Sequence, residues 1–438
     1  MRALSLYLIA ILFEAGACGS VKATVPDASI DGAGPGPSID SGGPAPIDGP
    51  LPDAPDAVNC DFAGVGSSCV FPPHIPVAAL RACFGAAAPA LDPPVGATLS
   101  FRKSGATYQV DCTPNCGGAT TTIPAQEALF QASAPLIELF CLSSVNIPAG
   151  VTVTADPSFD RAISILASGA IAIGGTVDFS GAQPGDVPGG TGGPGGYAGG
   201  GRVAPFNGAG PCGGAGGVPQ TSSTAPTGSG GGGGGHAGTG GGGGAGNPGI
   251  GGGAGGCSAP FGKLEGGSGG GAGGTGTVIA IGGTNFGSQF ASSGGGGAVA
   301  LVSRTSVAVT GTITANGAAG KVRTNNTSFN YDALGGTGGG AGGTIVLAGV
   351  TVNVSGSLRV DGGGGAIAWG NGGGGASGAN VNGSGGANGP SSTNGGAGAG
   401  GGGGYVRVFA ASGTANCATI ASPVAGCASA PLAGAPAE

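Results

Sequence analysis

The chain has 438 residues, of which 109 are Gly and 32 are Pro, and only 8% are charged. Gly and Pro at this level are typical of low-complexity sequence, but the mean hydropathy of +0.28 does not fit a highly charged disordered chain. The net charge of −7, with 13 thinly spread basic residues, argues against nucleic acid as a partner. Collagen is also excluded, because no sustained Gly-X-Y register with Pro runs through the Gly tracts.

The N-terminus predicts export. A basic start at Met1-Arg2, an apolar run over residues 3–13 and small residues up to residue 17 are the parts of a secretory signal peptide, here residues 1–17. A helix of that apolar run rises only about 16 Å, which is too short to span a bilayer. We therefore expect the chain after residue 17 to lie outside the cytoplasm.

The residues before Cys18 are Ala15-Gly16-Ala17, and they resemble the lipobox of bacterial lipoproteins. The resemblance implies that Cys18 is lipidated and attaches the chain to a membrane, as an outer-membrane or cell-surface lipoprotein. Ala15-Gly16-Ala17 is also an A-x-A site for ordinary signal peptidase, so free secretion is the alternative.

The cysteine content supports an oxidising compartment. Eleven cysteines are present, and setting Cys18 aside leaves an even number that could form five disulfides. These candidates are Cys60, Cys69, Cys83, Cys112, Cys116, Cys141, Cys212, Cys257, Cys417 and Cys427. Connectivity cannot be deduced from sequence, although pairing Cys212 with Cys257, and Cys417 with Cys427, would each close a loop within one segment.

Composition divides the chain after the signal peptide into four parts. Residues 18–59 begin with the lipid-site Cys and continue as a disordered Asp/Pro/Gly tether, and residues 60–137 form a small disulfide-containing cap. Residues 138–410 are a Gly-rich repeat domain, and residues 411–438 a C-terminal cap or tail. Within the first cap we expect a short helix at Val77–Phe84, a strand pair in Ala97–Val110 and a second short helix at Pro124–Ala132.

The repeat domain contains copies of three short alternating strands. Ile165, Ile173 and Val177 are eight and four residues apart, and Leu301, Val309 and Ile313 repeat those intervals. A third copy runs over residues 344–362 and a weaker one over 142–153. Partial copies are expected at residues 278–281 and 405–408.

One copy cannot bury its apolar face alone, so the copies must stack, at about 4.8 Å per layer. This predicts an all-β fold, a parallel β-helix (solenoid) of a few coils with long Gly-rich loop insertions, preceded by the small disulfide-bearing cap. Ser180, Asn316 and Asp361 occupy equivalent places, each followed by Gly, which predicts a turn with positive φ there.

Glycine tracts at about 182–275, 318–343 and 362–404 separate the copies. Fixing each Gly costs roughly 0.5–1 kcal/mol more than fixing Ala, so ordering them all would cost tens of kcal/mol. The tracts are therefore either mobile or packed as polyglycine-type helices tied by backbone hydrogen bonds.

A Gly run, an alternating strand and an Asn/Asp-Gly turn, behind an Asp/Pro-rich tether, resemble glycine-rich bacterial surface lipoproteins. The repeats are also similar to PGRS-type domains, although no PE domain is present. The resemblance covers about 138–410 and carries over no catalytic residue.

One group of polar residues is a candidate binding site. Aligning the copies stacks Asp178, Thr314 and Arg359 in an outward column, with Asp156, Asp160 and Arg161 near its first layers, which could be a sparse sugar-binding site. A Thr ladder for ice binding is interrupted in the same column by Asp178 and Arg359. We expect no cofactor.

A metal site at Cys112-x-x-x-Cys116 is disfavoured, because the chain has only His74 and His236 and no second closely spaced Cys pair. The function expected is a non-catalytic structural or adhesive one at the cell surface, in contact with extracellular carbohydrate or other surface proteins. A polysaccharide lyase or hydrolase is the alternative.

Overall fold

The computed structural model describes most of the cap and repeat domain. The described residues are 74–85, 87–185, 188–202, 206–218, 220–222, 228–246, 252–259, 261–278, 291–321, 335–366, 382–384 and 396–410. All of them belong to one compact unit, Pro55–Glu438, and the other unit is Met1–Ala54. Cys18, the tether, Cys60, Cys69, Cys417 and Cys427 lie outside the described residues.

The described part of the cap contains one helix and four strands before β5. The helix predicted at Val77 is present as α1 (Val77–Gly85), and the predicted strand pair is the antiparallel hairpin of β1 (Thr98–Ser104) and β2 (Thr107–Thr113). The second predicted helix is wrong. That stretch includes the end of β3 (Thr122–Pro124) and β4 (Glu127–Leu129), which pair with β2 and β5. Pairing with existing strands has overridden the local helix signal.

The repeats contribute three strands per copy. The first copy has β5 (Ile137–Leu142), β6 (Val145–Ile147) and β7 (Thr152–Ala155), and the second has β8 (Ala162–Ala167), β9 (Ile171–Ile173) and β10 (Thr176–Asp178). The third has β13 (Ala298–Ser303), β14 (Ser306–Val309) and β15 (Thr312–Thr314), and the fourth has β16 (Thr344–Gly349), β17 (Thr351–Val354) and β18 (Ser357–Arg359). Strand β19 (Tyr405–Ala410) follows, and β11 (Gln220–Ser222) pairs with β12 (Gly276–Val278).

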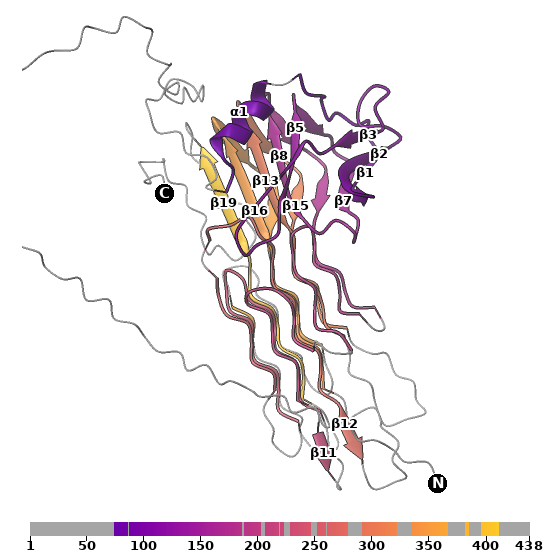
Figure 1. Cartoon of the computed structure of the whole chain (residues 1–438), viewed down its shortest axis with the longest axis vertical. Coiled ribbons are helices and arrows are strands. Elements are labelled where there is room, and N and C mark those ends of the chain that lie inside the picture. Colours follow the sequence, from indigo (N-terminus) through magenta and orange to yellow (C-terminus); the bar gives the residue numbers. More distant parts are fainter. Residues whose placement is uncertain are drawn as a thin grey trace, which may run out of the picture. The chain divides into compact units, whose positions relative to one another are not determined.

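Corresponding strands of successive copies pair in parallel, which gives three sheets. The sheet orders are β19-β16-β13-β8-β5-β4, β17-β14-β9-β6 and β18-β15-β10-β7-β1-β2-β3 (Figure 1). The register is the one that the intervals predict, with Ile165 opposite Leu301, Ile173 opposite Val309 and Val177 opposite Ile313. The predicted all-β class is confirmed, with parallel and mixed sheets and almost no helix.

One buried core joins the cap to the repeats. Phe101 of β1 makes edge-to-face contacts with Phe140, Phe159 and Phe179 at ring-centroid distances of 5.0, 6.0 and 5.7 Å. Strand β1 also pairs in parallel with β7. The cap hairpin therefore continues the sheet of the repeats and closes one end of their core.

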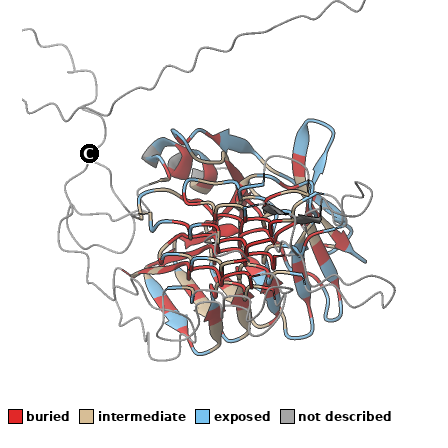
Figure 2. Ribbon diagram, turned by 90° about the horizontal axis from the view of Figure 1, so that it is seen from below, coloured by how far each residue is buried: buried red, intermediate tan, exposed pale blue. Residues whose placement is uncertain are grey.

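The described glycine tracts form an ordered array, which we call the glycine bundle. It comprises residues 189–200, 208–217, 228–236, 240–244, 252–256, 266–274, 291–297, 317–320, 335–343, 361–366 and 396–404. These segments extend from one end of the strands (Figure 1), and the buried residues gather in the middle of the array (Figure 2). Of the two states expected for the tracts, the described parts show the packed one.

Hydrogen bonds in the central segment, residues 228–236, repeat every three residues. The amides of Gly230 and Gly233 donate to segment 241–244, while those of Gly231 and Gly234 donate to segment 336–339. The next pair, Gly232 and Gly235, donates to segment 212–215. A three-residue period with no bonds within the segment is that of a polyproline II helix.

This packing explains why residues 230–235 are all Gly. A Cβ atom added at any of the six would lie against a backbone carbonyl of a neighbouring segment, far inside van der Waals contact. The carbonyls of Gly230 to Gly234 also accept bonds from three further segments, which contain Gly253, Gly271 and Ala399. Surrounded on six sides by backbone, the central segment has no direction in which a side chain could point.

The predicted positive-φ turn after Ser180, Asn316 and Asp361 is wrong. None of these three residues, nor the Gly that follows each, has a positive φ. A Cβ on the following Gly would instead meet a carbonyl of the bundle. The Gly is needed because the bundle begins there, and the three layers are linked by bonds from the Asn316 amide to Ser180 Oγ and from the Asp361 amide to Asn316 Oδ1.

The first prediction concerns this close packing. We expect Gly233→Ala to destabilise the fold by about 1–3 kcal/mol or more, because its Cβ would displace the backbone at Gly400. The matched control is Gly242→Ala in the same bundle, where the nearest atom is 3.9 Å away and the expected change is within about 0.5 kcal/mol. Thermal unfolding followed by circular dichroism checks both, and equal effects would contradict the packing.

Candidate functional site

The predicted outward column lies on the seven-stranded sheet. Asp178, Thr314 and Arg359 are opposite one another on β10, β15 and β18. The Thr314 hydroxyl donates to Asp178 Oδ1 at 2.8 Å, and the Arg359 guanidinium pairs with Asp361 Oδ2 at 2.9 Å. The structure brings the three residues together, and their polar groups are engaged by one another or by Asp361.

The column continues across the cap. We call it the charged row, and from β3 to β18 it consists of Thr122, Asp111, Ser100, Thr154, Asp178, Thr314 and Arg359. Asp111 accepts hydrogen bonds from Gln109 and Thr122 and forms an ion pair with Arg102. The cap end of the row is therefore also internally bonded.

A second row, two residues earlier on each repeat strand, was missed in the sequence. We call it the hydroxyl row, and it consists of Thr113, Thr98, Thr152, Thr176, Thr312 and Ser357. The first four are exposed and the last two half-exposed. The signal that could have revealed it is Thr or Ser two residues before each member of the charged row in all three main copies. Its cap members could not be placed without knowing that β1 pairs with β7.

A small pocket lies beyond the charged row, towards the glycine bundle. Its lining includes Asp156, Asp178, Ser180, Thr191 and Pro194. The Ser158 amide donates to Asp156 Oδ1 at 2.8 Å, and this bond holds the pKa of the Asp156 carboxyl below its ordinary value. The pocket thus holds an ionised carboxylate next to the carboxyl group of Asp178.

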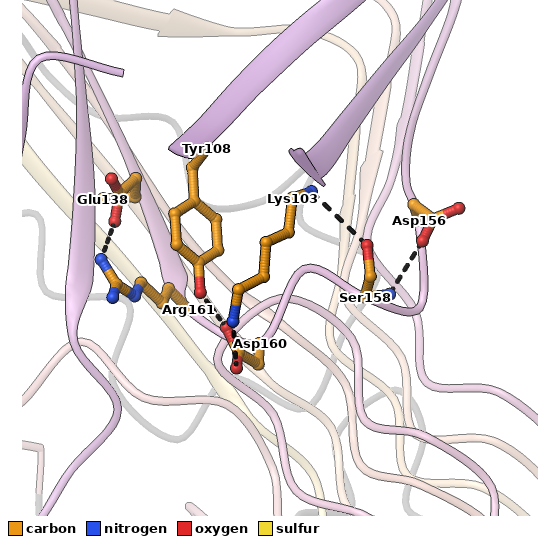
Figure 3. A network of polar contacts seen from close by, with 7 residues as sticks. All are labelled: Lys103, Tyr108, Glu138, Asp156, Ser158, Asp160 and Arg161. Carbon is orange, nitrogen blue, oxygen red and sulfur yellow. Dashed lines mark hydrogen bonds and ion pairs between the residues drawn. The ribbon is translucent and has the colours of Figure 1, made fainter. Parts of the chain in front are cut away.

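Asp160 and Arg161 belong to a second cluster, which is linked to Asp156 because the Lys103 amide donates to Ser158 Oγ at 3.4 Å (Figure 3). The Tyr108 hydroxyl donates to Asp160 Oδ1 at 2.5 Å, and Lys103 Nζ lies 3.6 Å from Asp160 Oδ2. The Arg161 guanidinium lies 4.2 Å from the centroid of the Tyr108 ring and donates to Glu138 Oε2 at 2.6 Å. Asp160 and Arg161 thus make their contacts with Tyr108 and Lys103 of the cap hairpin and with Glu138, and not with Asp178, Thr314 or Arg359.

This second cluster lies at the first copy of the repeat. Glu138 stands opposite Ile163, so a carboxylate occupies the position that the later copies give to an aliphatic core residue. Burial raises the pKa of Glu138, and the hydrogen bond from Arg161 opposes that rise. The first copy is followed by residues 156–161 and not by a glycine tract, and the ring of Tyr108 packs 5.0 Å from the ring of Phe159 in that segment. These contacts give the second cluster a structural role at the first copy.

A third polar cluster is buried where the strands meet the glycine bundle. His236 ends the central segment, and its Nε2 lies 2.9 Å from the hydroxyl of Thr344 at the start of β16. That hydroxyl donates to the Glu265 carbonyl at 2.7 Å, and the Glu265 carboxylate accepts from Tyr197 at 3.1 Å. The ring of Tyr405 packs edge-on against His236 at 5.1 Å. These contacts fix the bundle to the sheet.

Three disulfides are present among the described cysteines. They join Cys83 to Cys141, Cys112 to Cys116 and Cys212 to Cys257. The last is the pairing expected within one glycine tract, and the Cys112–Cys116 bond removes the two thiols that the alternative metal site would need. Within the described residues, no group of three or more His, Cys, Asp or Glu side chains could hold a metal ion.

No helix in the described ranges is long and apolar enough to cross a membrane. No family model matches this chain, and comparisons with curated proteins and with solved structures give no match either.

The second prediction concerns the buried His236. Burial lowers its pKa from about 6.5 to about 4, so the unfolded chain takes up a proton first as the pH falls. The stability due to the neutral ring is fully present above pH 6.5 and is lost as the pH falls towards 4, by about 3 kcal/mol. We expect His236→Gln to lack this component in denaturant unfolding between pH 4 and 7.

His74 is the internal control for that experiment. Burial also lowers its pKa to about 4, and it stays in both proteins, so the difference between the two stability curves isolates His236. Parallel curves for wild type and variant would show that His236 is not buried as described.

Proposed function

We propose that this protein is exported, is held on a membrane by a lipid on Cys18, and has a non-catalytic structural or adhesive role at the cell surface. The observation that carries the proposal is the glycine bundle. A segment bonded to neighbours on six sides has almost no conformational freedom and presents no functional side chains. Such an array suits a stiff scaffold that carries a contact surface away from its point of attachment.

The architecture that we propose for the strands is a parallel β-helix. Each copy supplies one strand to each of three sheets, and each strand pairs with its counterpart in the next copy. The glycine bundle would then be the set of insertions between the third strand of one coil and the first strand of the next. Sheets buried on both faces, as in β8 and β13, fit this arrangement.

The polar groups favour binding over catalysis. Glycoside hydrolysis needs a carboxylic acid whose pKa is raised, beside an ionised carboxylate. In the small pocket, the pKa of Asp156 is lowered instead. The pKa of Glu138 is raised, but its side chain is buried and bound to Arg161. Neither residue provides an accessible general acid.

Export is supported by the N-terminal pattern and by the disulfides, which persist in oxidising compartments. Attachment through Cys18 rests on the residues before it.

The third prediction tests the anchor. In cells supplied with radiolabelled palmitate, we expect wild-type protein to incorporate the label and fractionate with membranes. We expect Cys18→Ala to carry no label and to appear in the soluble exported fraction. Absence of label from exported wild type would make this a freely secreted protein.

The fourth prediction tests the role. We expect the purified protein to be retained by extracellular polysaccharide without releasing reducing sugar or unsaturated uronate. Asp178→Asn and Arg359→Gln serve as matched variants of the charged row. Turnover by wild type that is lost in either variant would replace the adhesive role with the enzymatic alternative.

A further inference from the structure

The hydroxyl row differs from the adjacent charged row because none of its groups is engaged by the residues that the structure describes. Within the described part of the chain, none of its six hydroxyls forms a side-chain hydrogen bond with another residue. In the adjacent charged row, by contrast, Thr122, Thr314 and the carboxylates of Asp111 and Asp178 are bonded within the protein. Six unengaged hydroxyls in register offer both donors and acceptors to a ligand.

Sheet geometry fixes the spacing of these hydroxyls. Neighbouring strands lie about 4.8 Å apart, so six strands place the hydroxyls along about 24 Å. A residue and its second neighbour on a strand are about 6.8 Å apart, which sets the distance to the charged row. The repeat along the hydroxyl row is close to the rise of one sugar unit in an extended glycan chain.

The turn before each repeat strand of the row fixes the spacing of the hydroxyls. Gly175, Gly311 and Gly356 lie in the turn that precedes the hydroxyl row on β10, β15 and β18. They come immediately before Thr176, Thr312 and Ser357. A Cβ at any of the three would collide with a backbone carbonyl of the preceding layer. The hydroxyls are therefore presented on tightly stacked backbone and need little reorganisation on binding.

Charge restricts the ligand class. The hydroxyl row carries no charge, and in the charged row Arg102 pairs with Asp111 and Arg359 with Asp361. Asp178 has no cation partner in the charged row and Asp156 lies in the same pocket, so the face is locally acidic and disfavours a polyanion, while the row has no line of carboxylates for a polycation. The long side chain of Arg359 and the exposed Asp178 also break the flatness that contact with an ice surface would need.

We infer that the hydroxyl row is the contact surface for an extended neutral polysaccharide that lies across the strands, parallel to the row. Its alternate hydroxyls would exchange hydrogen bonds with Thr98, Thr152, Thr176 and Thr312. This inference rests on the proposed adhesive function and names its ligand and its surface.

The test uses the full chain, immobilised neutral glycans (dextran, mannan and cello-oligosaccharides), an immobilised polyuronate as the charged glycan, and an ice-growth assay. The variant Thr152→Val/Thr176→Val/Thr312→Val removes three hydroxyls and keeps the β-branched shape. The matched control is Thr310→Val/Thr351→Val/Ser355→Ala, which removes three exposed hydroxyls from β17 and the turns next to β14 and β17. We expect binding of wild type and control to at least one glycan, and binding at least about tenfold weaker for the Val variant.

The outcomes separate this inference from the adhesive function. Equal binding by all three proteins would overturn the assigned surface and leave the adhesive role intact. Binding only to charged glycans would overturn the ligand class. Arrest of ice growth by wild type, without retention on any glycan, would assign the row to ice and overturn both. Thermal unfolding of each variant shows whether it is folded, and Thr152→Ser/Thr176→Ser/Thr312→Ser should restore binding.

Discussion

The close approach of one backbone to another is the constraint on which the rest of this structure depends. In the central segment consecutive amides reach carbonyls of three neighbouring segments in turn, and a Cβ atom would break those contacts. One net backbone hydrogen bond contributes about 0.5–1.5 kcal/mol. That is similar to the extra entropy lost on ordering a Gly, roughly 0.5–1 kcal/mol. The bundle can therefore be ordered only where nearly every amide is bonded.

The close backbone packing of the bundle also fixes how successive layers of the sheets align. Segments of the bundle continue from β10, β15 and β18, so a shift of one layer against the next would break hydrogen bonds in the bundle and uncover the apolar core together. Thr344 shows the coupling at one residue. It begins β16, its hydroxyl bonds the Glu265 carbonyl, and it contacts His236 at the end of the central segment. The register of the strands and the register of the bundle segments are therefore coupled.

Periodicity made the repeat strands predictable, because the second and third copies share eight- and four-residue intervals between buried Ile, Val and Leu, and the fourth copy shortens only the first interval, by one residue. The cap was harder, since β4 forms by pairing with β5 and not from a local preference for strand. The glycines after Ser180, Asn316 and Asp361 were assigned the wrong cause. Their need for Gly arises from contacts with segments far away in the chain, and no local pattern records such contacts. For the same reason Asp160 and Arg161 could not be placed with Tyr108.

The candidate site consists of side chains that the stacking of copies leaves on the outer face of the sheet. When copies stack in register, an outward residue type that recurs at one position becomes a line of identical groups, whether or not each group is useful alone. The charged row varies between copies, and its members bond to one another. The hydroxyl row keeps Thr or Ser through all four copies and the cap hairpin, and its hydroxyls are left without partners in the described structure. A repeating ligand matches a repeating line of groups, and for this reason we propose a polymer that lies across the strands as the partner of this face.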